Sequence, residues 1–440
     1  MRPPHPAGAR RRHEHAPARK ARHPMDRLQN TVRPYAWGSP TALPELLGEH
    51  PTGAPQAELW MGAHPGAPSL VDRGSGPVPL SEVIAADPDG ELGAAAVAAF
   101  GPRLPFLLKL LAAAQPLSLQ VHPDPAQAVA GFADEEARGV PRDAPHRNYK
   151  DDQHKPELLA ALTPFEGLCG FRPAAEAAGL LAALDVDGLK PYADILRAAP
   201  EEAALREVLT AVLSADRDEI ADTVRQAAAA ASRLAGQPGP HAEDYAAYAG
   251  IARHHPGDPG LLAAMLLHFV RLRPGEALYL DAGVPHAYLS GLGVEIMASS
   301  DNVLRCGLTS KHVDVPELLR VVRFEATGPG VLVPEPDADG AEVYRTPVGE
   351  FRLSRHVLAA GGAPRSLDAQ AAQIVLCTDG EVTLVDESGQ QAPGGGDPSG
   401  TTGERDGELR LARGRSVYLP ASTCPRVSGE GTIFRATVAV

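Results

Sequence analysis

The sequence lacks long apolar runs and has little cysteine. No stretch approaches the roughly 18 consecutive apolar residues that a membrane-spanning helix needs, so we expect no membrane partner. Only four cysteines occur in 440 residues, they are widely separated, and no two form a C-x-x-C pair: Cys169, Cys306, Cys377 and Cys424. Isolated thiols fit a reducing compartment better than a disulfide framework. We therefore expect a cytoplasmic protein.

Basic residues are also in deficit. The chain has 41 Lys and Arg against 55 Asp and Glu, a formal net charge of -14. A phosphate backbone is bound by a basic face, so this balance argues against nucleic acid as a partner. Residues 1–24 are the exception, with seven Lys and Arg and one acid, but no apolar stretch follows them as a secretory signal would require. We expect 1–24 to be a disordered tail, or a mis-assigned start with Met25 as the first residue.

The remainder has the composition of an ordinary globular protein, 44% hydrophobic and 22% charged, and is long enough for two or three domains. Short apolar runs alternate with turn signals over 104–171, which predicts β structure with loops, and the β pattern resumes at Arg273. Between them, apolar residues recur at helical spacing. The sequence thus predicts a mainly β protein with three parts: a β domain of 25–173 and 271–327, a helical insertion of 174–270, and a C-terminal β domain of 328–440.

A faint repeat relates the two β domains. "PGEALYLDAGVPH" (274–286) and "RGRSVYLPASTCP" (413–425) share a Gly, a Tyr-Leu pair and a small residue before a turn. Such a unit is typical of antiparallel jelly-roll barrels. The second copy has Pro425 where the first has His286, so only the first could bind a metal there. We predict two barrels, the first metal-binding and the second degenerate.

The stretch "PLSLQVHPDP" (116–125) alternates as a strand does. Its Leu and Val residues point to one face, while Ser118, Gln120 and His122 point to the other. Because Gln120 and His122 are two residues apart on one strand face, both can reach a single ion inside a barrel. The polar face therefore indicates a cavity rather than bulk water.

Two further segments offer metal ligands. His286 ends the "AGVPH" turn, and "KDDQHKPELL" supplies Glu157 close to His154. With Gln120 and His122 these give imidazoles, a carboxylate and an amide oxygen, a set that suits Zn²⁺ with one position open. Spacing alone leaves open whether Glu157 or His154 is the ligand.

Long strings around these residues resemble the type I mannose-6-phosphate isomerases, also called phosphomannose isomerases, zinc enzymes of the cupin superfamily. The resemblance covers nearly all of the chain after Met25. Its main strings are "YAWGS" (35–39), "ELWMGAHP" (58–65), "PFLLKLLAAAQPLSLQVHPDPAQA" (105–128), "YKDDQHKPELLAALTPFEGLCGFR" (149–172) and "LDAGVPHAYLSGLGVEIMASSDNVLRCGLTSKHVDVPEL" (280–318). A helical insertion and a degenerate terminal barrel are expected in this family too.

The resemblance implies the metal ligands, the cofactor and the reaction. It places one zinc ion per chain on four residues, which settles the choice in favour of Glu157: Gln120, His122, Glu157 and His286. It implies interconversion of mannose 6-phosphate and fructose 6-phosphate through an enediol, either supplying mannose 6-phosphate for GDP-mannose or feeding mannose into glycolysis. We expect a monomer whose partner is a small-molecule hexose 6-phosphate.

The isomerase chemistry needs a base, a group that stabilises the oxyanion, and a site for the phosphate. The resemblance places the family's catalytic arginine on Arg305, and Lys155 could share its role, although either cation could instead pair with Glu295 or Asp301. Glu295 and Asp301 are alternative enediol bases, and the choice stays open. His154 is a candidate for ring opening. For the phosphate we name Ser118, Lys109 and Lys311.

Two other functions fit the same residues. One is a cupin that binds sugar phosphates without turnover. The other is an iron-dependent cupin oxygenase that uses two histidines and one carboxylate. Gln120 as an extra ligand and the candidate phosphate-binding lysines argue against the oxygenase.

Overall fold

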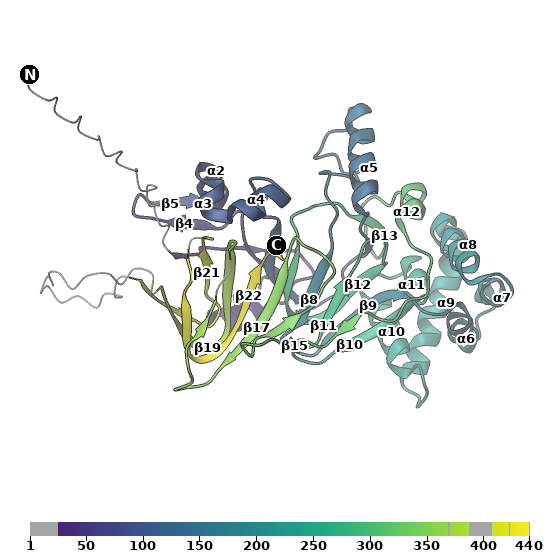
Figure 1. Cartoon of the computed structure of the whole chain (residues 1–440). Coiled ribbons are helices and arrows are strands. Elements are labelled where there is room, and N and C mark those ends of the chain that lie inside the picture. The colour runs from purple at the N-terminus through teal and green to yellow at the C-terminus, as the bar shows by residue number, and fades with distance from the viewer. Residues whose placement is uncertain (1–24, 368–369, 387–406, 422, 440) are drawn as a thin grey trace, which may run out of the picture.

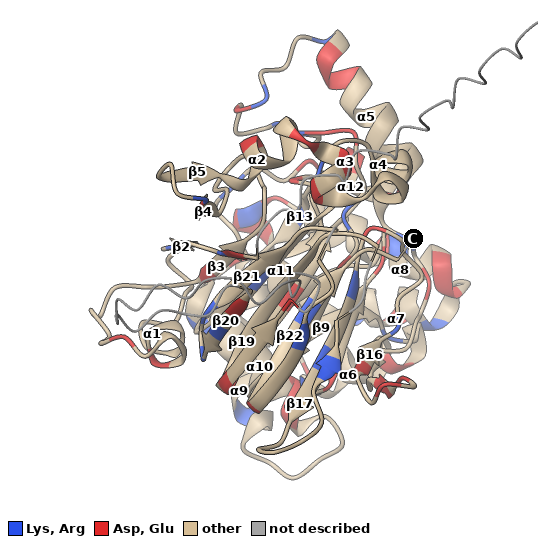
Figure 2. Ribbon diagram, turned by 60° about the vertical axis from the view of Figure 1, so that its left-hand side comes forward, with Lys and Arg blue, Asp and Glu red and all other residues tan. Residues whose placement is uncertain are grey.

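The structure is a computed structural model and describes residues 25–367, 370–386, 407–421 and 423–439. The tail expected at 1–24 lies outside the described residues. Two large antiparallel sheets stand side by side, and a block of helices covers the far end of one of them (Figure 1). Lys and Arg positions are interspersed with Asp and Glu positions along the elements in view in Figure 2. In the described part of the chain, no helix is both long and apolar enough to cross a bilayer.

The first sheet has eleven strands and carries all the metal-site segments. Its main path runs β14-β11-β8-β12-β6-β3-β2, and β7, β9, β10 and β13 pair at its side. The strands are β2 Thr31–Arg33, β3 Glu58–Met61, β6 Phe106–Ala113, β7 Leu119–Val121, β8 Glu157–Ala161, β9 Phe165–Phe171, β10 Leu267–Leu272, β11 Ala277–Leu280, β12 His286–Ala298, β13 Leu304–Gly307 and β14 Val331–Leu332.

The second sheet has nine strands and is formed mainly by the C-terminal residues. Its path runs β1-β21-β19-β22-β17-β16-β15, with β18 and β20 at its side. The strands are β1 Asp26–Arg27, β15 Glu335–Pro336, β16 Glu342–Tyr344, β17 Arg352–Leu358, β18 Arg365–Ser366, β19 Gln373–Val385, β20 Glu408–Ala412, β21 Ser416–Leu419 and β22 Arg426–Thr437. A separate small ribbon pairs β4 Leu70–Asp72 with β5 Pro77–Pro79.

The sequence repeat corresponds to equivalent strands in the two sheets. Its copies contain β11 and β21, and each copy leads into a long strand, β12 or β22. β11 and β12 both pair with β8, while β21 and β22 both pair with β19. The same local turn thus builds the same three-strand unit twice.

The helical block follows its predicted range with one difference. Its elements are α6 Ala174–Ala183, a 3-10 turn Asp187–Leu189, α7 Lys190–Ala198, α8 Glu201–Ser214, α9 Arg217–Ala235, α10 Ala242–His254 and α11 Gly260–Ala264. Their apolar faces form one core that also includes Leu119 and Val121 of β7. The predicted helix up to residue 270 is wrong at its end, because 267–272 form β10, which pairs with β9.

Helices also occur where β structure with loops was expected. α5 Pro125–Ala137 lies inside the 104–171 segment. It begins with a capping box, in which the Asp124 side chain accepts from the Gln127 amide and the Gln127 side chain accepts from the Asp124 amide. The remaining helices are α1 Ala42–Leu47, α2 Leu80–Ala86, α3 Pro88–Leu92, α4 Ala94–Phe100 and α12 Val315–Val321.

Candidate metal centre

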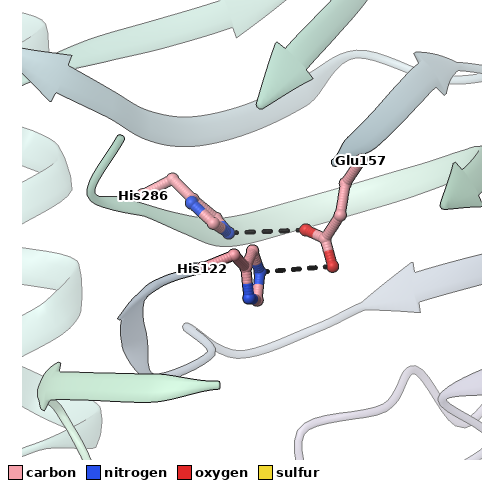
Figure 3. A group of neighbouring side chains, drawn as sticks. All are labelled: His122, Glu157 and His286. Carbon is pink, nitrogen blue, oxygen red and sulfur yellow. Dashed lines mark ion pairs between the residues drawn. The ribbon is translucent and has the colours of Figure 1, made fainter. Parts of the chain in front are cut away.

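Three buried side chains at the ends of strands of the first sheet, or directly next to one, converge on one point (Figure 3). His122 follows β7, Glu157 begins β8 and His286 begins β12. The two carboxylate oxygens of Glu157 lie 3.4 Å from His122 Nε2 and 3.4 Å from His286 Nε2. One potential ligand atom from each residue lies within 4.8 Å of the others. The first sheet thus assembles three of the four predicted ligands.

Main-chain carbonyls fix the orientation of both imidazoles. His122 Nδ1 donates to the carbonyl of Asn302 at 2.8 Å, and His286 Nδ1 donates to the carbonyl of Val284 at 3.0 Å. Each Nε2 lone pair is therefore directed at the Glu157 carboxylate, in the arrangement that metal-binding histidines usually have.

This arrangement is unfavourable without a cation. His122 Nε2 and Glu157 Oε2 are buried and have no hydrogen-bond partner among the described residues. Burial, together with the charge of Lys155, lowers the pKa of His122 to about 4, so its imidazole is neutral at pH 7. The lone pair of the neutral His122 imidazole then faces an ionised carboxylate, and His286 Nε2 lies 3.4 Å from the same carboxylate. A divalent cation between these atoms would satisfy all of them, so the residues fit the predicted zinc.

Gln120 lies beside this group. It stands opposite His286 in the β7–β12 pairing, and its side-chain amide is 3.3 Å from His286 Nε2. Turning the amide by half a rotation would bring its oxygen, a metal ligand, to the same point. Gln120 thus lies next to the metal group, and its role as the fourth ligand stays a prediction.

A polar cavity of about 570 Å³ adjoins the metal group. Nine of the twelve predicted site residues line it: Lys109, Ser118, Gln120, Lys155, Glu157, Glu295, Asp301, Arg305 and Lys311. The polar face of "PLSLQVHPDP" therefore does face a cavity, while Leu119 and Val121 lie in the core.

Two buried lysines in the cavity are paired with carboxylates. Lys155 Nζ lies 2.8 Å from Glu157 Oε1. Lys109 Nζ lies 2.9 Å from Glu295 Oε2 and 3.8 Å from Glu58 Oε1. Burial lowers the pKa of Lys109, but Glu295 and Glu58 outweigh it and the net shift is upward. Lys109 is thus a cation that lines the cavity and is paired with two carboxylates, and its role as a phosphate ligand stays a prediction.

The two candidate bases differ in environment. Glu295 is 2% exposed, and burial raises its pKa despite the opposing charge of Lys109. The flanking Val294 and Ile296 lie in the apolar core, as the alternation of "GVEIM" predicts. The Asp301 side chain is 49% exposed, its carboxylate lies 3.5 Å from His64 Nε2, and a hydrogen bond from His64 lowers its pKa.

Arg305 and Lys311 form a cationic rim. Within the described part of the chain, neither side chain makes an ion pair or a hydrogen bond. Burial lowers the pKa of Arg305, and burial with the nearby Arg305 charge lowers that of Lys311. The alternative that Arg305 pairs with Glu295 or Asp301 is excluded, because these acids face Lys109 and His64 instead.

His154 is placed away from the cavity. Its Nε2 contacts Glu350 Oε1 at 2.6 Å, which links the loop before β8 to the segment before β17. Conversely, sequence reasoning missed Tyr288, which lines the cavity, is 2% exposed, and has a buried hydroxyl without a hydrogen-bond partner among the described residues. It lies two residues after His286 in β12, so strand alternation could have found it.

The fold and site together define a metal-binding protein of the antiparallel β class, with a polar cavity beside the metal group. Residues 25–174 match the family model for the type I phosphomannose isomerase catalytic domain. Mannose-6-phosphate isomerase of Escherichia coli is 41% identical over 415 residues, which cover 93% of this chain and 99% of that protein. The relative from Bos taurus is 32% identical over 83% of this chain and 90% of its own.

Solved structures agree with these relatives. Zinc-bound mannose 6-phosphate isomerase superposes with a TM-score of 0.83 at 37% identity, covering 95% of this chain and 100% of the other. A point mutant of phosphomannose isomerase from Salmonella typhimurium matches with the same coverage, identity and TM-score. The chain therefore belongs to the mannose-6-phosphate isomerase family.

Proposed function

We propose that the chain is a zinc-dependent aldose–ketose isomerase that interconverts D-mannose 6-phosphate and D-fructose 6-phosphate. The observation that carries the proposal is the buried His122–Glu157–His286 group, whose lone pairs converge beside a cavity with a cationic rim. One zinc ion per chain would be held by these residues and Gln120. When bound, it would supply Lewis-acid stabilisation of negative charge on a sugar oxygen.

Glu295 is our proposed base for the enediol step. A proton must leave one carbon next to the carbonyl and return to the neighbouring carbon, so the base has to be ionised before it accepts the proton. Burial raises the pKa of Glu295, which strengthens it as a base, while Lys109 at 2.9 Å keeps it ionised. Asp301 has a lowered pKa and is the weaker base. Lys155 and Arg305 are proposed to stabilise the oxyanion.

The substrate phosphate is proposed to bind Lys311 and Ser118 at the cavity rim. Lys311→Ala should raise the KM for mannose 6-phosphate about tenfold, the lower range for losing one charged hydrogen bond, and change kcat less. Lys190→Ala, which removes an exposed lysine of α7 that pairs with Asp187, is the matched control. An unchanged KM in Lys311→Ala, measured by initial rates, would contradict this assignment.

Three further proposals follow from the sequence and the family. The two sheets are proposed to be cupin-type jelly-roll barrels, the second without a metal, which the repeated three-strand unit supports. The protein is proposed to be a cytoplasmic monomer, and its buried cysteines Cys169, Cys306 and Cys377 form no disulfide. Its product would supply mannose 6-phosphate for GDP-mannose or feed mannose into glycolysis.

The decisive experiment is a coupled assay of fructose 6-phosphate formation from mannose 6-phosphate, with metal analysis. We expect about one zinc per chain, loss of activity on chelation, and recovery on adding Zn²⁺. Protein that binds the sugar phosphate but does not isomerise it would indicate a non-catalytic cupin. Activity that requires iron and O₂ would indicate an oxygenase.

A further inference from the structure

Asn302, between β12 and β13, joins two loops that carry site residues. It is fully buried. Its side-chain oxygen accepts from the amides of Lys150 and Asp151 at 2.7 and 3.2 Å. Its side-chain nitrogen donates to the carbonyls of Asp151 and Gln153, both at 2.8 Å. One amide side chain therefore makes four main-chain hydrogen bonds to the loop that precedes β8.

The main chain of Asn302 also contacts the metal group. Its carbonyl is the acceptor for His122 Nδ1 at 2.8 Å. The loop that its side chain binds leads directly into the metal site, because Lys155 and Glu157 come two and four residues after Gln153. Asn302 therefore connects His122 to the segment that supplies Glu157. In the sequence it is 180 positions from His122 and 145 positions from Glu157.

We propose that Asn302 is a positioning residue for the metal: its side chain fixes the two loops against each other, so that its carbonyl orients His122. The inference rests on the metal site of the proposed function. It is tested by metal affinity rather than by turnover, so it can fail while the isomerase activity is confirmed. Asn302 itself would touch neither substrate nor metal.

The physical argument follows from these hydrogen bonds. Without the Asn302 side chain, the amides of Lys150 and Asp151 and the carbonyls of Asp151 and Gln153 lose their hydrogen-bond partner. The loop before β8 is then no longer held at a fixed distance from the main-chain carbonyl of Asn302. His122 Nδ1 then loses a stable acceptor, and its Nε2 is directed less firmly at the metal. Outer partners of metal-binding histidines typically contribute 10- to 100-fold to metal affinity.

Two substitutions and one matched control test the proposal. Asn302→Ala should weaken zinc binding about 10- to 100-fold in competition with a chelator. Asn302→Asp keeps the acceptor oxygen but loses both donor bonds, so its affinity should lie between those of Asn302→Ala and the unchanged protein. Gln373→Ala is the control, because Gln373 is another fully buried amide, bonded to the Leu367 carbonyl at 2.8 Å in the second sheet.

The control separates positioning from general stability. Gln373→Ala should lower the thermal midpoint to a similar extent as Asn302→Ala but leave the zinc affinity unchanged. Unchanged zinc affinity in Asn302→Ala, or an equal loss in both variants, would overturn the proposal.

A measurement on the unchanged protein avoids any problem of variant folding. Because coupling between two sites is reciprocal, zinc should slow hydrogen exchange of the Lys150 and Asp151 amides, which donate to Asn302, by about tenfold or more. Amides of β19 in the second sheet should exchange alike with and without zinc. Equal exchange at Lys150 and Asp151 in both states would contradict the link.

Discussion

Glu157→Gln is expected to abolish stable zinc binding. The substitution keeps the shape of the side chain but removes the carboxylate that lies between the Nε2 atoms of His122 and His286. A neutral amide would leave the divalent charge uncompensated and Lys155 without its partner at 2.8 Å. Loss of an outer partner of a metal ligand lowers metal affinity by up to about 100-fold, and we expect the loss of a direct ligand to lower the zinc affinity by more than that. Zinc content after dialysis should approach zero.

The matched control is Glu91→Gln. Glu91 lies in α3, is as deeply buried as Glu157, and is not among the residues that line the cavity. Its carboxylate pairs with Arg73 Nη1 at 2.6 Å. This variant should retain about one zinc per chain, measured by metal analysis after the same dialysis. Full occupancy in Glu157→Gln would show that the carboxylate is not a ligand.

The fold could be predicted where local periodicity decides it. The apolar residues of α8 and α9 recur at helical spacing, and "ALYL" and "SVYL" mark equivalent strands. β10 was missed because the apolar residues of "LLHFVRL" continue the pattern of the preceding helical segment, and only pairing with β9 decides its state. β1 is only two residues long, and its place beside β21 is a tertiary pairing without a local signal.

α5 was missed for a different reason. It contains several alanines and exposes Val129, so its apolar stripe is weak. The Asp124–Gln127 capping box, with Pro125 at the first helical position, was nevertheless visible in the sequence. Capping residues therefore carried information here that hydrophobic periodicity did not.

In the site, sequence reasoning found individual residues better than their partners. Strand alternation placed Glu295 on the cavity side, but its pairing with Lys109 comes from the register of β12 on β6, across 186 positions. For the same reason, spacing could not show that Arg305 has no carboxylate partner among the described residues. His154 is adjacent to Lys155 in the chain, yet its Nε2 contacts Glu350, a partner 196 positions away that spacing could not reveal.

Arg305→Ala is expected to lower kcat about 100-fold or more, the effect of removing one donor to a developing oxyanion. Arg305 lies opposite Gln120 in the β13–β7 pairing, lines the cavity, and has no carboxylate partner among the described residues, so its charge is available to substrate. No hydrogen bond or ion pair joins it to His122, Glu157 or His286, so zinc content should stay near one per chain. Initial rates with metal analysis test both statements.

The main competing role for Arg305 is phosphate binding, since Lys311 is near enough for its pKa to be lowered by the Arg305 charge. The two roles differ in kinetics. Loss of oxyanion stabilisation lowers kcat and kcat/KM together, whereas loss of a phosphate contact raises KM. Arg305→Lys should recover part of kcat, because it keeps the charge but not the planar donor pair. A rise in KM alone in Arg305→Ala, equal to that of Lys311→Ala, would assign Arg305 to the phosphate site.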